Sequence, residues 1–238
     1  MSRERHNEFG QVVGFPLPDW KPPPLPPHET VQGHWARLDP LDPSKHAGSI
    51  YRGVCMDPEG RNWTYSPAGP FSCSKDFVAW LRSIASREIP MWFAVVDRSR
   101  REALGFASYF EADPPNGVIE IGGVHFTEPL KRTVAATEAM YLMLRTAFDL
   151  GYRRCEWRCD ALNGPSRAAA ERLGFSFEGV FRQHWVYNER NRDTAWYSMI
   201  DSEWEAASQA FEEWLDPANF DDSGVQRSRL RARHRGAS

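Results

Sequence analysis

The stretch Asn163-Gly-Pro-Ser-Arg-Ala-Ala-Ala-Glu-Arg-Leu-Gly-Phe-Ser-Phe-Glu-Gly179 predicts a short helix with well-marked ends, followed by a strand. Its first residue can accept a hydrogen bond from a free amide at a helix start, and Pro165 suits a first turn, where its missing N–H costs nothing. Gly174 supplies the permissive backbone at which helices end, and Phe175 then opens an alternating strand pattern. The helix is therefore expected to begin near Gly164 and to pack on a sheet.

The local pattern alone requires no more than an ordinary amphipathic helix packed on a sheet. The residue order N-x-x-S-R-x-x-x-x-R-L-G-F-x-x-E-G, however, resembles the last conserved block of GNAT-type N-acetyltransferases, particularly the RimJ and RimL ribosomal-protein branch. Val31–Leu41 is similar to the start of such domains, where a strand G-x-x-x-x-L-x-P-L leads into the first helix. Phe181–Trp196 is similar to their strand and turn ending in Arg-Asp. The resemblance covers roughly residues 29 to 205.

The composition indicates one soluble-type domain with tails. The chain has 238 residues, of which 41% are hydrophobic and 13% aromatic, enough for a substantial core. A formal charge of −3 gives no general attraction to nucleic acid or an anionic membrane. No apolar run of about 18 residues and no secretory signal is evident, so we expect a cytoplasmic protein without a membrane partner. The four cysteines lack metal-ligand spacing, so we expect reduced thiols and no metal.

Three segments follow from the distribution of proline and arginine. Residues 1–28 are a Pro-rich arm, expected to be a spacer or to lie on its own domain, although a Pro-x-x-Pro element could instead recruit an aromatic-lined partner. Residues 29–216 form the domain. Residues 217–238 are expected to be a flexible Arg-rich tail, solvated at its end, with phosphate contacts to RNA or a ribosome as the alternative. Assembly into an oligomer is left open.

Hydrophobic periodicity predicts the elements of the domain. The expected helices are 43–56, 74–87, 134–150 and 202–215 besides the one already described, and the expected strands are 31–41, 91–96, 104–111, 118–126, 153–160, 177–185 and 194–200, with a polar turn at 187–193. Strands and helices mixed in this order imply one sheet with helices on both faces. The resemblance implies an α/β (α+β), three-layer GNAT-like fold whose mixed, mostly antiparallel sheet has about seven strands.

A phosphate site is expected where strand 118–126 leads through a turn into the helix from Val134. The free amides at a helix start attract an anion, and Lys131 and Arg132 add positive charge, unless they are simply a solvated pair. Members of the resembled family usually read R/Q-x-x-G-x-G/A here. Lys131 and Val134 depart from that pattern, while Ala136 retains the last small position. The resemblance assigns acetyl-CoA binding to Lys131, Arg132, Thr133, Val134, Ala135, Ala136 and Thr137.

The resemblance also implies where the coenzyme arm and its thioester lie. The pantetheine is expected between the strands ending at Phe126 and Asp160, paired with the backbone near Val124 and Phe126. Asn163 and Ser166 are expected beside it, with Ser166 protonating the departing thiolate. Both residue types also occur at helix starts without any catalytic role.

The sequence offers several bases for the attacking amine. Glu120, on the central strand, is the expected one, acting through water, although it could equally be paired inside the sheet. Glu138 and His125 are further candidates. An α-amino group, with a pKa of about 8, needs less help than a lysine at about 10.4, so the need for a base depends on the acceptor.

Three residues of the last hairpin, His184, Trp185 and Tyr187, could shape an acceptor pocket or could be core residues. The resulting prediction is an acetyl-CoA-dependent N-acetyltransferase in which a primary amine attacks the thioester directly. The amine would belong to a protein N-terminus, an amino acid or a small molecule. The alternative is a non-catalytic acyl-CoA-binding sensor or scaffold.

Overall fold

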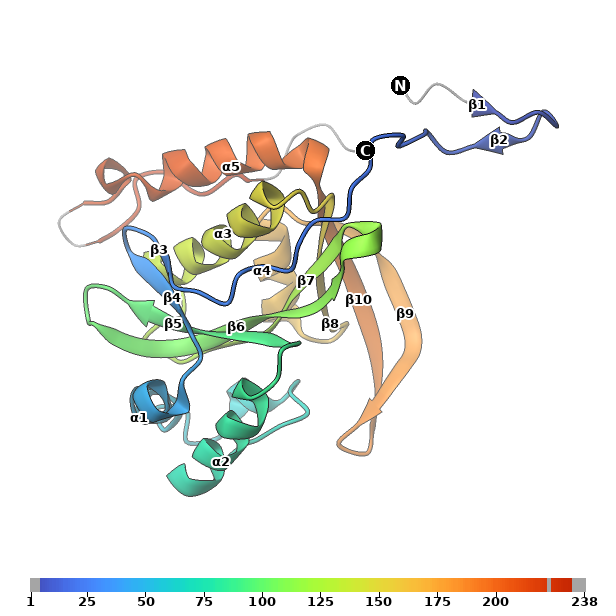
Figure 1. Cartoon of the computed structure of the whole chain (residues 1–238). Helices are drawn as coiled ribbons and strands as arrows, with labels where there is room; N and C mark the ends of the chain where they lie inside the picture. Colours follow the sequence, from blue (N-terminus) through green and yellow to red (C-terminus); the bar gives the residue numbers. More distant parts are fainter. Residues whose placement is uncertain (1–4, 222–223, 233–238) are drawn as a thin grey trace.

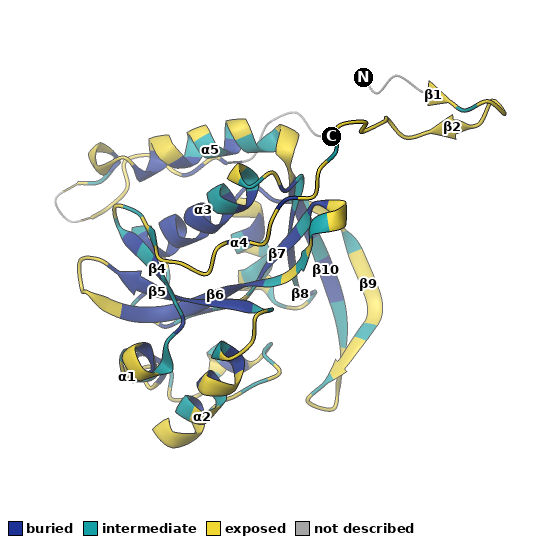
Figure 2. Cartoon of the chain, in the orientation of Figure 1, coloured by how far each residue is buried: buried dark blue, intermediate teal, exposed yellow. Residues whose placement is uncertain are grey.

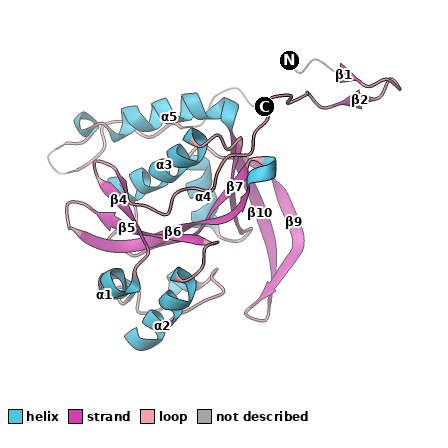
Figure 3. Ribbon diagram, viewed as in Figure 1, coloured by secondary structure: helices cyan, strands magenta, loops and turns pink. Residues whose placement is uncertain are grey.

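The computed structural model describes residues 5–221 and 224–232, and in this part of the chain one large sheet carries helices on both faces (Figures 1 and 3). The eight strands run in the order β3-β4-β5-β6-β7-β8-β10-β9, and β1 and β2 pair in a separate hairpin. The strands are β1 (Arg5–His6), β2 (Val12–Val13), β3 (Val31–Gln32), β4 (Ala36–Pro40), β5 (Met91–Asp97), β6 (Glu102–Asp113), β7 (Val118–Phe126), β8 (Arg154–Asp160), β9 (Ser176–Tyr187) and β10 (Arg190–Ile200). Within the large sheet only β7 and β8 pair in parallel; the other neighbours are antiparallel.

Two helical layers bury the two faces of this sheet. The helices are α1 (Pro43–Val54), α2 (Ser74–Ala85), α3 (Val134–Asp149), α4 (Gly164–Arg172) and α5 (Asp201–Leu215), with short 3-10 turns η1 (Arg61–Trp63), η2 (Pro114–Asn116) and η3 (Pro217–Asn219). The larger apolar core lies between the sheet and α3, α4 and α5, and the smaller one lies under α1 and α2. Figure 2 shows α3 almost wholly buried beneath α5. The expected three-layer, mostly antiparallel architecture is therefore confirmed, with eight strands in its main sheet.

The opening helix of the sequence argument has the expected ends. The Asn163 side chain accepts a hydrogen bond from the Ser166 amide at 3.1 Å, and α4 begins at Gly164. Gly174 follows the helix with a φ of +98°, which a residue with a side chain rarely adopts. The local signals therefore specify both ends of α4.

The single strand expected at 31–41 is wrong, because the chain folds back on itself there as β3 and β4. The turn between them is held by Glu138 of α3, whose carboxylate accepts hydrogen bonds from the amides of His34 (2.8 Å), Trp35 (2.6 Å) and Ala36 (2.5 Å). The carboxylate thus supplies the acceptors that a neighbouring strand would otherwise provide. The bend is set by a residue about a hundred positions away.

The polar turn expected at 187–193 is also wrong. β9 continues to Tyr187 and β10 starts at Arg190, and these two residues pair directly. The connection is Asn188 and Glu189, both with positive φ, +49° and +58°. A two-residue turn of this kind matches the twist of the paired strands, so the hairpin is longer than hydropathy indicates.

The Pro-rich arm lies across the domain once it leaves the β1–β2 hairpin, which projects clear of the rest (Figure 1). Trp20 donates its indole N–H to the Pro115 carbonyl at 3.0 Å, and His28 contacts the Trp92 carbonyl through Nε2 at 2.9 Å. Pro23 is buried between these two contacts. The arm is thus attached at both ends of its extended part.

The described part of the Arg-rich segment packs on the domain and does not extend away from it. Asn219 accepts hydrogen bonds from Ser228, including one from the amide at 2.9 Å, and Trp214 donates to the Gln226 side chain at 2.8 Å. Leu230 and Ala232 are buried in the larger core. Arg233 and Arg235 of the expected tail lie outside the described residues.

Candidate active site

The sheet is interrupted between β7 and β8. These parallel strands pair at only three positions, Val118 with Arg154, Ile119 with Cys155 and Glu120 with Glu156. Beyond that point β7 changes register against β6 twice, and Gly123 adopts a φ of +59°. A side chain at Gly123 would collide with the Trp92 ring, so this bend requires glycine. Among the described residues, the remainder of β7 has no pairing with β8.

Val124 and Phe126, the residues expected to face the coenzyme arm, lie on the part of β7 that pairs with β6 but not with β8. Both are half-buried and pack against the larger core. The Phe126 carbonyl accepts a hydrogen bond from the Asn62 side chain at 2.9 Å. Asn62 thus occupies one backbone group here, while the edge of β7 beyond Glu120 lacks a β8 partner, which is the kind of edge at which an extended ligand can pair as a strand would.

Two helices start at the same end of this break, because parallel strands end at the same edge and α3 follows β7 while α4 follows β8. At α3, the Thr133 hydroxyl accepts a hydrogen bond from the Ala136 amide at 3.1 Å. The amides of Val134 and Ala135 have no acceptor within the helix and remain available to an anion. Arg132 precedes them with a φ of +61°, so the chain turns sharply just before the helix.

The remaining residues assigned to phosphate binding surround this helix start. The Val134 side chain packs against the larger core, which explains how a branched residue replaces glycine there. Ala135 and Ala136 are buried. Lys131 lies on the surface and pairs with Glu128 at 2.6 Å. Thr137 faces α4, where its hydroxyl accepts a hydrogen bond from Arg172 at 3.1 Å.

Asn163 and Ser166 lie at the start of α4, beside the end of β8. The side-chain oxygen of Asn163 is occupied by the helix cap, as the alternative interpretation of the sequence allowed. The Ser166 hydroxyl oxygen accepts a hydrogen bond from the indole of Trp157 at 3.0 Å. Both assigned residues therefore stand at the break, and Trp157 joins them although no motif singled it out.

Glu120 is buried in an ion pair on the opposite sheet face from the larger core. Its carboxylate contacts the Arg158 guanidinium, which also contacts Glu111 at 2.7 Å and lies over the Trp196 ring at 4.8 Å. Burial raises the pKa of Glu120, and the hydrogen bond to Arg158 opposes this rise. The alternative left open by the sequence, a paired Glu120, describes this structure.

The two other candidate bases are engaged elsewhere. The carboxylate of Glu138 is occupied by the β3–β4 turn described above. His125 is stacked on Trp63, with ring centroids 4.0 Å apart, and on Phe106, 5.2 Å apart. Burial lowers the pKa of His125 to about 3, so its imidazole is neutral near pH 7. We therefore assign both residues to packing.

The β9–β10 hairpin is joined to the loop that follows α1. Asn188 donates to the Ser66 carbonyl at 3.1 Å, and Arg190 to the Thr64 carbonyl at 3.3 Å. Tyr65 in the same loop donates its hydroxyl to the Leu162 carbonyl at 3.0 Å, just before α4. These long-range contacts have no sequence motif, and they place the loop against both the hairpin and the start of α4.

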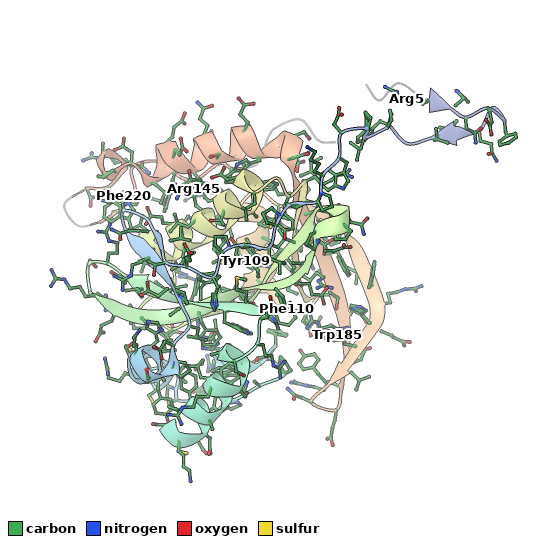
Figure 4. All side chains as sticks on the ribbon, in the orientation of Figure 1. Arg5, Tyr109, Phe110, Arg145, Trp185 and Phe220 are labelled. Carbon is green, nitrogen blue, oxygen red and sulfur yellow. The ribbon has the colours of Figure 1, made fainter. Side chains whose placement is uncertain are left out.

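The hairpin aromatics are not core residues. Trp185 is exposed, while His184 and Tyr187 are half-buried, and Figure 4 shows Trp185 away from the layer of α3 and α5. Tyr187 donates its hydroxyl to Asp160 at the end of β8, at 2.8 Å. Burial and this carboxylate raise the pKa of Tyr187 to about 12. The hairpin side chains thus reach the end of the strand at the break.

Within the described ranges, 5–221 and 224–232, no helix is long and apolar enough to cross a membrane. The same residues contain no group of three or more His, Cys, Asp or Glu arranged to hold a metal ion. All four cysteines are free thiols, two exposed and two buried.

Comparisons with known proteins agree with this geometry. The family described as Acetyltransferase (GNAT) domain matches residues 36–176. A GCN5-related N-acetyltransferase from Brucella melitensis is 43% identical, with a TM-score of 0.88 over 90% of this chain and 97% of that one. A GNAT-family protein from Chromobacterium violaceum ATCC 12472 is 41% identical, with a TM-score of 0.76 over 82% and 97%.

A more distant structure resembles the branch suggested by the sequence. It is the acetyltransferase from Salmonella typhimurium that modifies the N-terminal serine of ribosomal protein L7/L12, 17% identical with a TM-score of 0.59 over 71% of this chain and 96% of that one. At this identity the likeness concerns the fold alone. No protein of curated function matches the chain in sequence.

Proposed function

The chain belongs to the GNAT family of acetyltransferases, and from this premise we propose that it transfers acetyl from acetyl-CoA to a primary amine by direct attack on the thioester. The observation that carries the proposal is the break between β7 and β8, with the starts of α3 and α4 at the same end of these strands. The amine belongs to a protein N-terminus, an amino acid or a small molecule.

The residues around the break are suited to binding acetyl-CoA, the donor of the acetyl group. The free amides at the start of α3, with Lys131 and Arg132 beside them, would hold the diphosphate. The ion pair of Lys131 with Glu128 is partly exposed and worth at most about 1 kcal/mol, so a phosphate can replace it. The unpaired edge of β7 at Val124 and Phe126 would hold the pantetheine, with Asn163 and Ser166 on its other side.

The reaction requires the amine to arrive with its lone pair free. Glu120 would accept its proton through water, since its carboxylate is buried and its pKa is raised by burial. Arg158 holds that carboxylate and must share it with the water that relays the proton. This arrangement suits an α-amino group, which is partly deprotonated near neutral pH, better than a lysine side chain.

An acceptor screen tests the proposal. Coenzyme A release would be followed with a thiol reagent, using acetyl-CoA and peptides with free or blocked N-termini, free amino acids and polyamines. We expect release with at least one class and a higher melting temperature with acetyl-CoA. A melting shift without release from any amine would refute the enzyme and leave a binding protein. No shift and no release would refute both.

A further inference from the structure

The indole N–H of Trp157 has a single hydrogen-bond acceptor in the described structure, the Ser166 hydroxyl oxygen at 3.0 Å. Trp157 lies on β8 and is only 6% exposed. An indole nitrogen donates and never accepts, and a buried donor needs an acceptor. The Ser166 oxygen is therefore held by a hydrogen bond that comes from inside the core.

This contact restricts the direction of the Ser166 hydroxyl hydrogen. A hydroxyl carries one hydrogen and two lone pairs, and one lone pair is taken by Trp157. The Ser166 backbone is fixed as well, because its amide donates to Asn163 at 3.1 Å. The hydroxyl hydrogen cannot point at the indole N–H, which is itself a donor, so it must point to another acceptor.

We propose that Trp157 is a positioning residue for acetyl transfer, holding the Ser166 oxygen so that its hydroxyl hydrogen is presented to the departing coenzyme sulfur. This rests on the proposed function. The C–N bond forms and the C–S bond breaks, the electron pair stays on sulfur, and sulfur takes the Ser166 proton. The serine oxygen recovers a proton from water while the amine nitrogen releases one, so the enzyme is unchanged. A donor on the serine oxygen also strengthens the hydroxyl as a donor.

The test is a double-mutant cycle of Trp157→Phe and Ser166→Ala, measured with acetyl-CoA and the fastest amine of the screen. Trp157→Phe retains the ring and removes the N–H. We expect its kcat to fall about 5- to 10-fold, the loss of one hydrogen bond, while the dissociation constant for acetyl-CoA changes less than about 2-fold. In the Ser166→Ala background the same substitution should cause no further fall in kcat.

Trp214→Phe is the matched control. Trp214 is also buried, at 5% exposure, and also donates its indole N–H to a side-chain oxygen, that of Gln226 at 2.8 Å. It lies at the end of α5 and takes no part in the proposed site. This control should lower the melting temperature and leave kcat within about 2-fold.

Several outcomes overturn the inference. An unchanged kcat in Trp157→Phe, or effects that multiply with Ser166→Ala, refutes the positioning role alone. Absence of acetyl-CoA binding and turnover in the unaltered protein refutes the proposed function and the positioning role together. If Trp157→Phe does not fold, the NMR signals of the indole N–H groups are compared between the unaltered protein and Ser166→Ala. The contact predicts that one of the ten tryptophan signals shifts in Ser166→Ala, and ten unshifted signals refute it.

Discussion

The carboxylate of Glu138 offers the sharpest test of how this fold is held together. It accepts three successive backbone amides at 2.5 to 2.8 Å, and its side chain is buried, with 5% of the residue exposed. Replacing Glu138 with alanine leaves the Ala36 amide buried without an acceptor, at a cost of about 1–3 kcal/mol. The amides of His34 and Trp35 are half-buried and can reach water, so each loses about 1 kcal/mol.

The expected loss in free energy of unfolding for Glu138→Ala is therefore about 3–5 kcal/mol, similar to breaking a buried charged interaction. Glu138→Gln keeps one acceptor oxygen but turns an NH2 group toward backbone donors, so about half of that loss is expected. Urea unfolding followed by circular dichroism measures both. Glu205→Ala, on the exposed face of α5, is the control and should stay within about 0.5 kcal/mol. A loss below about 1 kcal/mol for Glu138→Ala would show that the turn does not depend on this carboxylate.

Three further substitutions test other parts of the structure. Val134→Gly should lower the free energy of unfolding by about 2 kcal/mol through lost packing and helix propensity, yet leave acetyl-CoA affinity within about 3-fold by isothermal titration; a tenfold change would contradict the role of the backbone amides. Gly123→Ala should destabilise the protein by more than about 2 kcal/mol because of the Trp92 clash and the positive φ, and a neutral result in thermal melts would refute the bend. The pKa of His125 in the folded protein, about 3, lies below the ordinary 6.5, so the unfolded chain binds a proton more readily. The free energy of unfolding should therefore fall as pH drops below 6.5, by about 2 kcal/mol at pH 5. The same pH series on His125→Phe should lack this contribution.

The sequence predicts the elements that carry local signals. Both ends of α4 follow from Asn163 and Gly174. The family resemblance predicts the fold and the acetyl donor chemistry, which the comparisons confirm. These features depend on residues close together in the chain or on a shared pattern.

The wrong strand at 31–41, the alternative left open for Glu120 and the contacts that were not predicted all lie where residues distant in sequence meet. The bend between β3 and β4 depends on Glu138, and nothing between 31 and 41 announces it. Likewise, the pairing of Glu120 depends on Arg158, whose contact appears only once β7 and β8 are side by side. The joining of the hairpin tip to Ser66 has no local signal either. Hydropathy reports burial, whereas these contacts depend on the order of strands in the sheet.

Because β7 and β8 pair at only three positions, the large sheet consists of two groups of strands that are weakly joined. Strands β3 to β7 are neighbours in the order in which they occur in the sequence, and β8 to β10 form the second group. Within each group, paired strands are therefore close in the strand order of the chain. Strands β7 and β8 pair from Val118 to Glu120, and the Gly117 carbonyl just before β7 accepts the amides of Arg153 and Arg154. A molecule bound across this seam touches both groups and stabilises their association by mass action. Acetyl-CoA bound as proposed would therefore also hold the two parts of the domain together.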